Sequence, residues 1–86
     1  MYKNRAENGR NNIAGKNIGR LRKELKEKTS QRKFAEMLQI SGLDVDKNAI
    51  QRMESGERFI TDIELRIIAS VLDVTYNELL EEQKEI

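Results

Sequence analysis

The sequence predicts an all-α fold, a bundle of five short helices in one small domain of 86 residues. Proline is absent, and aromatic residues make up only 5% of the chain, which disfavours a β-sheet. β-Branched residues do not alternate with polar ones, whereas apolar residues recur at the three- and four-residue steps of an amphipathic helix. Cap residues and glycines separate five such segments, so we expect five helices with one apolar face each.

The composition excludes several kinds of site. Cysteine and histidine are both absent, so the chain has no disulfide, no thiolate or imidazole metal site and no nucleophile activated by histidine. No apolar run approaches the ~18 residues that span a bilayer, and the N-terminus lacks the hydrophobic core of a signal peptide. We therefore expect a cytoplasmic protein without a cofactor or a membrane partner, although many secreted domains also lack cysteine.

Charge is distributed unevenly along the chain, although the net charge is only +1. Residues 1–33 contain eleven basic and three acidic residues, a net charge of +8, and residues 34–86 contain five basic and twelve acidic residues, a net charge of −7. This asymmetry favours one side that faces a polyanion and one side that is repelled by it. The alternative is an ordinary small protein with a charged, solvated surface.

The N-terminal third divides into an arm and a helix. Residues 1–12 are polar and basic and lack a hydrophobic period, so we predict a flexible basic arm. The folded domain is expected over residues 13–82. Its first helix should run from residue 13 to about residue 28, because three apolar residues share one stripe: Ile18, Leu21 and Leu25.

The second helix is predicted over residues 31–40, after a cap at Thr29-Ser30. Phe34, Ala35 and Leu38 form its apolar face. Gln31 and Arg32 lie in its first turn, where free backbone N–H groups and the positive end of the helix dipole attract phosphate.

The third helix is predicted between Asp46, which can cap its first turn, and Gly56, which can end it. Only Ile50 and Met53 share its apolar face. Its other face is polar and consists of Lys47, Asn48, Gln51, Arg52 and Ser55. Lysine and arginine read guanine in the DNA major groove, and asparagine and glutamine read adenine. The face therefore suits the major groove, and an ordinary solvated face is about equally compatible with these residues alone.

The last two helices begin with capping boxes, Thr61 with Glu64 and Thr75 with Glu78. The fourth helix should bury a regular apolar stripe, and the fifth should run from about residue 76 to residue 82. Residues 83–86 are expected to be a frayed acidic tail. The complete set of side chains expected to face inward is Ile18, Leu21, Leu25, Phe34, Ala35, Leu38, Leu43, Ile50, Met53, Leu65, Ile68, Ala69, Leu72, Val74, Leu79 and Leu80.

The chain resembles the XRE-type helix-turn-helix family of phage-repressor and Cro-like proteins from about residue 18 to residue 80. The resemblance rests on the order of several short pieces: Leu21-Arg22-Lys23-Glu24, Ser30-Gln31, Phe34-Ala35 with Leu38, Ile50-Gln51-Arg52-Met53-Glu54-Ser55-Gly56, Leu65, Ala69-Ser70-Val71-Leu72, Val74 and Glu78-Leu79-Leu80. It implies a five-helix bundle of the lambda-repressor type, in which the second and third helices form the helix-turn-helix and the third enters the major groove.

The resemblance also implies roles for individual residues. Gln31 would touch phosphate or a base, and four residues would lie at base-reading or phosphate-contacting positions: Lys47, Asn48, Gln51 and Arg52. Ser55 and Arg58 would lie near the DNA backbone. Glu54 would form a structural ion pair with Arg22 instead of facing DNA.

The chain departs from the family pattern in two links. The link between the first two helices is a little longer than usual, and about five additional residues lie between Ala35 and Ile50. A longer second helix or a longer loop would absorb them.

These expectations combine into a sequence-specific transcriptional regulator, a repressor that binds double-stranded DNA as a homodimer on an inverted repeat. The fifth helix or the tail, with Tyr76, Leu80 and Ile86, is the expected dimer contact, and a place for these residues in the core or in disorder is equally compatible. The alternative function is a protein-interaction module, such as an antitoxin-like or accessory subunit. An enzyme is not expected, because Asp44 and Asp46 are explained as turn and cap residues, and no small-molecule ligand is implied.

Overall fold

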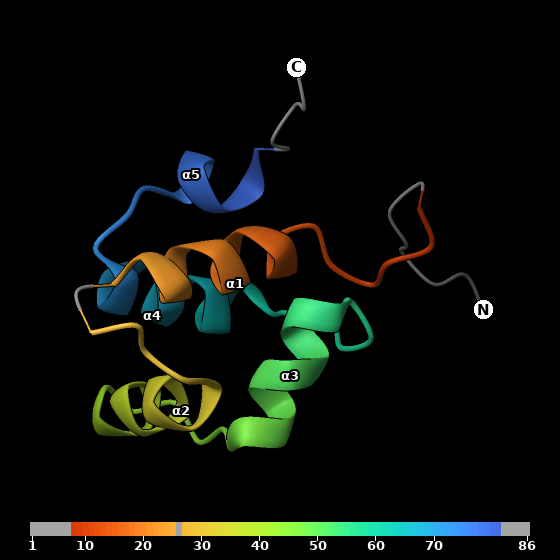
Figure 1. Ribbon diagram of the computed structural model, residues 1–86. Helices are drawn as coiled ribbons and strands as arrows, with labels where there is room; N and C mark the ends of the chain where they lie inside the picture. The colour runs from red at the N-terminus through yellow and green to blue at the C-terminus, as the bar shows by residue number, and fades with distance from the viewer. Residues whose placement is uncertain (1–7, 26, 82–86) are drawn as a thin grey trace.

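The computed structural model describes residues 8–25 and 27–81. Within this part the chain forms five helices and no strand, so the expected all-α bundle is confirmed (Figure 1). The helices are α1 (Gly15–Glu24), α2 (Gln31–Ile40), α3 (Lys47–Ser55), α4 (Asp62–Leu72) and α5 (Tyr76–Leu80). None of them is long and apolar enough to cross a membrane.

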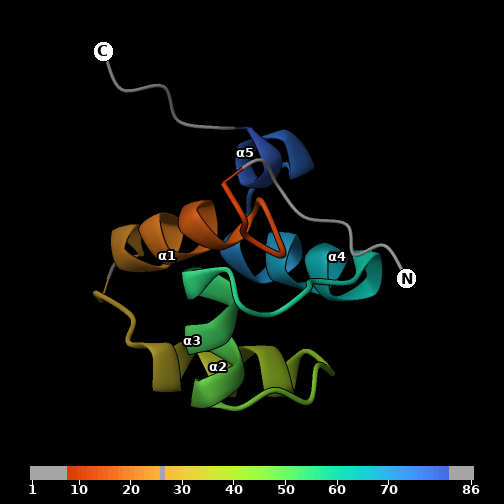
Figure 2. The same ribbon diagram turned by 90° about the vertical axis from the view of Figure 1, so that its right-hand side faces the viewer.

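α1 lies between α3 and α5 (Figure 1). In both ribbon views α1 and α4 occupy the middle of the molecule, with α5 on one side and α2 and α3 on the other (Figures 1 and 2). α1 packs against α3 and α5, and α4 packs against α2 and α5. This arrangement leaves α2 and α3 together at one end of the bundle.

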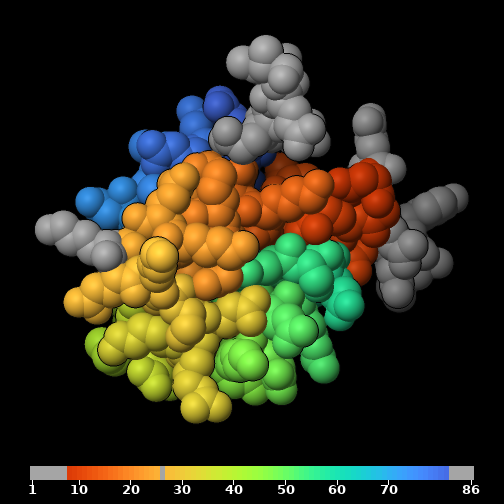
Figure 3. Space-filling model, viewed as in Figure 1, coloured from red at the N-terminus to blue at the C-terminus, as the bar shows by residue number. Residues whose placement is uncertain are grey.

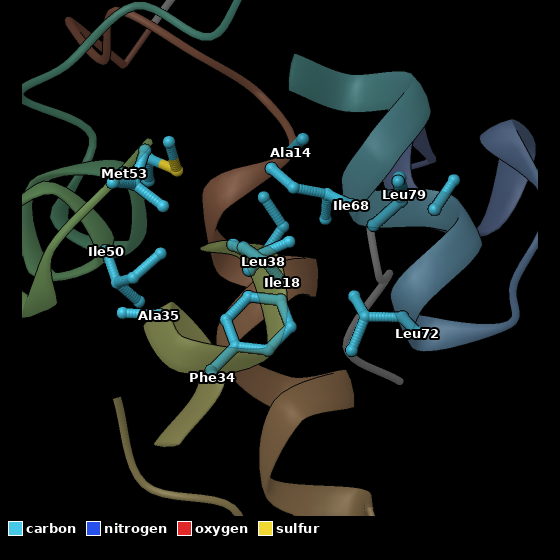
Figure 4. Packing of buried hydrophobic residues seen from close by; sticks show 12 residues of the cluster. Ala14, Ile18, Phe34, Ala35, Leu38, Ile50, Met53, Ile68, Leu72 and Leu79 are labelled. Atoms are coloured by element: carbon cyan, nitrogen blue, oxygen red, sulfur yellow. The ribbon is translucent and has the colours of Figure 1, made fainter. Parts of the chain in front are cut away.

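Side chains from all five helices meet in one core (Figure 4). The largest fully buried side chains come from each helix in turn: Ile18, Phe34, Leu38, Ile50, Met53, Ile68 and Leu79. Full burial of a side chain of this size contributes about 1.5–3 kcal/mol. The core therefore follows the apolar stripes of the sequence.

Three residues differ from the expected core. Leu80 was expected to face inward and is 37% exposed, because the five residues of α5 turn only Leu79 fully into the core. Ala14 and Val45 were not in the expected set and are buried, at the start of α1 and just before α3.

Side-chain caps define the starts of four helices. Ser30, Asp46, Thr61 and Thr75 each accept a hydrogen bond from the backbone N–H three residues later, and the last two form complete capping boxes. α2 and α3 accordingly have the expected boundaries, and α4 begins where its capping box predicted. α5 begins at Tyr76 as expected but ends at Leu80 instead of near residue 82, since Glu81 is already extended.

α1 is shorter than expected, since it ends at Glu24 instead of near residue 28. Leu25 is already extended, with φ −63° and ψ 150°. The Arg22 guanidinium donates a hydrogen bond of 2.7 Å from Nη1 to the Thr29 carbonyl oxygen, which holds the link against α1. This bond explains why the apolar period of the sequence does not continue as helix.

Candidate nucleic-acid interface

The connection between α2 and α3, residues 41–46, is held at both ends. Gly42 turns the chain with φ 97°, a conformation that favours glycine. The Leu43 N–H donates to the Leu38 carbonyl oxygen at 2.9 Å, and Gln39 Nε2 donates to the Val45 carbonyl oxygen at 2.7 Å. The additional residues therefore form an ordered loop after a helix of the expected length.

The outward face of α3 is polar and open. Its five outward side chains are all exposed: Lys47, Asn48, Gln51, Arg52 and Ser55. Ile50 and Met53 are fully buried on the opposite face and fix the helix to the core. Among the residues that the structure describes, no ion pair involves Lys47 or Arg52. These two cations are thus available to an anionic partner.

The carboxylate of Glu54 joins three elements. Arg22 of α1 donates to it from Nε at 2.7 Å and from Nη2 at 3.0 Å. Gln31, at the first position of α2, donates from Nε2 to Glu54 Oε1 at 3.1 Å. The Arg22 and Glu54 side chains are only 9% and 14% exposed, so the pair is largely removed from water. It holds α1, the start of α2 and the last turn of α3 in one relative position.

Gln31 and Arg32 lie beside this pair in the first turn of α2. Gln31 is half-buried, because its amide bonds Glu54, and Arg32 is exposed. α1, the start of α2 and α3 share the face of the molecule that Figure 3 shows.

Arg58, expected near the DNA backbone, forms an ion pair within the chain and remains partly exposed. Its Nη2 lies 2.8 Å from Glu64 Oε2, in an ion pair with the glutamate of the α4 capping box. Burial raises the pKa of the Glu64 carboxyl, but the hydrogen bond and charge of Arg58, together with hydrogen bonds from Thr61, outweigh burial and leave the pKa below its ordinary value. Arg58 therefore connects the loop after α3 to α4, and its side chain is still 32% exposed.

Residues 8–12, which we call the N-terminal strap, were expected to belong to a flexible arm. The structure instead binds this segment to the end of α3, while residues 1–7 lie outside the described part of the chain. Arg10 donates from Nη2 to the Glu54 carbonyl oxygen at 2.7 Å and from Nη1 to that of Ser55 at 3.1 Å. A cation here also offsets the negative end of the helix dipole.

Two asparagines complete the strap. Asn11 donates from its backbone N–H to the Gly56 carbonyl oxygen at 2.8 Å. Asn12 is buried and donates from Nδ2 to the carbonyl oxygens of Met53 at 3.0 Å and Arg58 at 2.7 Å. The strap satisfies carbonyl groups that the end of an α-helix leaves unpaired. This contact could not be predicted from the sequence, because residues 8–12 are polar and show no helical period.

Two of the three residues expected at a dimer contact lie in the described part of the chain. Tyr76 and Leu80 are 52% and 37% exposed, and Ile86 lies outside the described residues. Tyr76 and Leu80 border a groove of about 450 Å³ between α4 and α5, together with Asp62, Ile63, Leu65 and Arg66.

The chain matches the model of a known family. A family model described as Helix-turn-helix matches residues 18–79, which include most of α1, all of α2 to α4 and all of α5 except its last residue. No curated protein and no solved structure matches the chain. The N-terminal strap precedes the matched residues.

Proposed function

Because the chain belongs to the XRE-type helix-turn-helix family of DNA-binding regulators, we propose that it is a sequence-specific transcriptional repressor. In this proposal it binds an inverted-repeat operator as a homodimer, with α3 of each copy in the major groove. The observation that carries the proposal is the outward face of α3, five exposed polar side chains on a helix whose other face is fully buried.

We divide the contacts by chemistry. Asn48 and Gln51 have the amide groups that pair with adenine, and Arg52 has the donors that pair with guanine. Lys47, Ser55 and the first turn of α2, with Gln31 and Arg32, contact phosphates and set the position of α3. Arg58 lies near the DNA backbone in this proposal, because its side chain is 32% exposed while it pairs with Glu64.

The homodimer is proposed from the groove between α4 and α5. Ile63 is 69% exposed and borders the groove with Tyr76 and Leu80, so three large apolar side chains are accessible there. Asp62 and Arg66 border the same groove, so two copies related by a two-fold axis could pair opposite charges across an apolar centre. Such pairing would place two recognition helices on one DNA duplex.

In-vitro selection from a random DNA pool tests both parts of the proposal. A recovered palindrome supports a homodimer that reads sequence, a single half-site supports a monomer, and no enrichment contradicts sequence-specific binding. The protein-interaction alternative predicts no enrichment and no salt-dependent gel shift, because phosphate contacts weaken steeply with salt.

Gln51→Ala should then relax the preference at one base position by about 1–3 kcal/mol. Asn77→Ala, an exposed amide on α5, is the matched control and should leave the selected sequence unchanged. An equal loss of affinity on every sequence would show that Gln51 only positions the backbone.

A further inference from the structure

Three basic side chains line one side of α1, outside the two helices of the helix-turn-helix. Lys16, Arg20 and Lys23 follow one another at steps of four and three residues, so they share one face of the helix. Lys16 and Lys23 are exposed, and Arg20 is half-buried. We call these three residues the α1 ridge.

The α1 ridge borders a groove of about 460 Å³ between α1 and the end of α3. Gly15 and Gly19 also line the groove, and Glu54 of α3 lies across from them. A Cβ atom on Gly15 would collide with the Met53 carbonyl oxygen, and one on Gly19 would lie 3.1 Å from Glu54 Oε1. The two glycines thus let α1 approach α3 closely, which holds the ridge beside the last turn of α3.

The charges around the groove leave a net positive surface. Glu54 is already paired with Arg22, and Glu24 lies 3.3 Å from Arg20 in an exposed pair. Within residues 8–25 and 27–81 no ion pair forms with Lys16 or Lys23. Two ammonium groups on flexible stems are therefore available to an anion.

The groove is continuous with the proposed DNA contacts. Glu54 borders it and also accepts the hydrogen bond from Gln31, while Ser55, the next residue of α3, is exposed. Figure 3 shows α1 next to α2 and α3 on one face of the molecule, above them in that view. An object that contacts the start of α2 and the outer face of α3 would therefore also lie against α1.

We propose that the α1 ridge is a second DNA-backbone site, which binds phosphates flanking the major groove that α3 enters. The inference rests on the proposed function. Lys16 and Lys23 are seven residues apart, about 10 Å along the helix axis, so the two lysines engage different phosphates. The ligand is a polyanion and not a single phosphate ion. The groove is open, and lysines that neutralise DNA phosphates gain affinity by releasing the counterions condensed on the DNA.

Salt dependence of binding tests the proposal. Lys16→Gln, Lys23→Gln and the double variant are compared with the unchanged chain by fluorescence anisotropy, on a selected operator duplex and on a duplex of unrelated sequence. Each lost phosphate contact should reduce the slope of log K against log salt by about 0.9. The loss of affinity between 50 and 200 mM salt should then be about 3.5-fold smaller for each lysine removed. The reduction should be the same on both duplexes, because phosphates carry no sequence information.

Two acidic residues give a control matched in net charge. Glu24→Gln removes the acid beside the ridge and should increase affinity on both duplexes. Glu81→Gln changes the net charge equally at the end of α5 and should not. The combined variant Lys23→Gln/Glu81→Gln has the original net charge and should keep the reduced slope.

The possible failures are distinguishable. Unchanged slopes in the lysine variants, with the unchanged chain still binding its operator, would overturn the α1 ridge and leave the proposed function intact. If the unchanged chain binds neither duplex, the proposed function fails, and the ridge inference fails with it. Thermal melts of the Lys16, Lys23 and Glu81 variants should match that of the unchanged chain, since these residues are exposed and form no ion pair among the described residues. Glu24→Gln loses the exposed pair with Arg20 and should lower Tm by only about 1–4 °C.

Discussion

Replacing Arg22 by alanine should destabilise this protein far more than replacing Arg20, although both arginines lie on α1 and both pair with a glutamate. The Arg22 and Glu54 side chains are 9% and 14% exposed, whereas those of Arg20 and Glu24 are 37% and 59% exposed. Among the residues that the structure describes, Arg22→Ala would leave the largely buried Glu54 carboxylate with only the Gln31 amide as a side-chain donor.

The expected magnitudes differ by almost tenfold. Removing one partner of a buried pair costs about 3–5 kcal/mol, while an exposed pair four residues apart on a helix contributes about 0.3–0.5 kcal/mol. One kcal/mol corresponds to about 4–8 °C in Tm for a domain of this size. Arg22→Ala should therefore lower Tm by at least about 12 °C, and Arg20→Ala by only about 1–4 °C.

Thermal unfolding followed by circular dichroism at neutral pH measures both changes. Salt should reduce the effect of Arg20→Ala and leave most of the effect of Arg22→Ala, because buried pairs are screened much less. Replacing both partners, as in Arg22→Met/Glu54→Leu, should recover part of the lost stability, since no buried charge remains unpaired. A Tm for Arg22→Ala within about 3 °C of that for Arg20→Ala would refute the argument that this pair is desolvated and fixes α3.

Three further predictions concern polar and close contacts elsewhere. Asn17→Ala should cost about 1–3 kcal/mol in thermal melts, because the Asn17 amide is the buried donor to two carbonyl groups at the end of α5; the exposed Asn77→Ala should cost almost nothing. Gly15→Ala should reduce the free energy of unfolding in urea more than Gly19→Ala does, because the new methyl group collides with a backbone carbonyl at the first position and lies 3.1 Å from the Glu54 carboxylate at the second. The lowered pKa of Glu64 makes its contribution to stability complete above the ordinary glutamate pKa of about 4.3, with loss as the pH falls through the lower folded pKa. The difference in unfolding free energy between the unchanged chain and Glu64→Gln should thus shrink as the pH falls from 6 to 3, and a constant difference would contradict the assignment.

The boundaries of most helices could be predicted because they depend on local chemistry. The Ser30 hydroxyl, the Asp46 carboxylate and the two threonine capping boxes act on backbone groups three residues away, which the sequence shows directly. The buried stripes of α2 and α4 follow from the helical period in the same way. The end of α1 could not be predicted, because it depends on the bond from Arg22 to the Thr29 carbonyl oxygen across the following link.

The candidate site was predictable where it depends on exposure and not where it depends on long-range polar contacts. The outward face of α3 follows from the burial of Ile50 and Met53 alone. The sequence does not predict the pair of Arg58 with Glu64, because the capping box already accounts for Glu64. In the structure the Glu64 carboxylate accepts hydrogen bonds both from the Thr61 backbone N–H and from Arg58. Sequence patterns assign one role to each side chain, so they miss the second partner of a residue that has two.

The contacts of α1 and the strap explain why so few apolar residues suffice to fix α3. Apolar packing is tolerant of small shifts, whereas a hydrogen bond weakens steeply with angle and distance. Arg22 bonds the carboxylate in the last turn of α3, and Arg10 and Asn12 bond backbone carbonyl groups of the same turn. The end of α3 is therefore held by Arg10 and Asn12, which precede the residues that match the family model, and by Arg22 of α1. The angle at which α3 meets a partner is then set by the first quarter of the chain as much as by the helix-turn-helix itself.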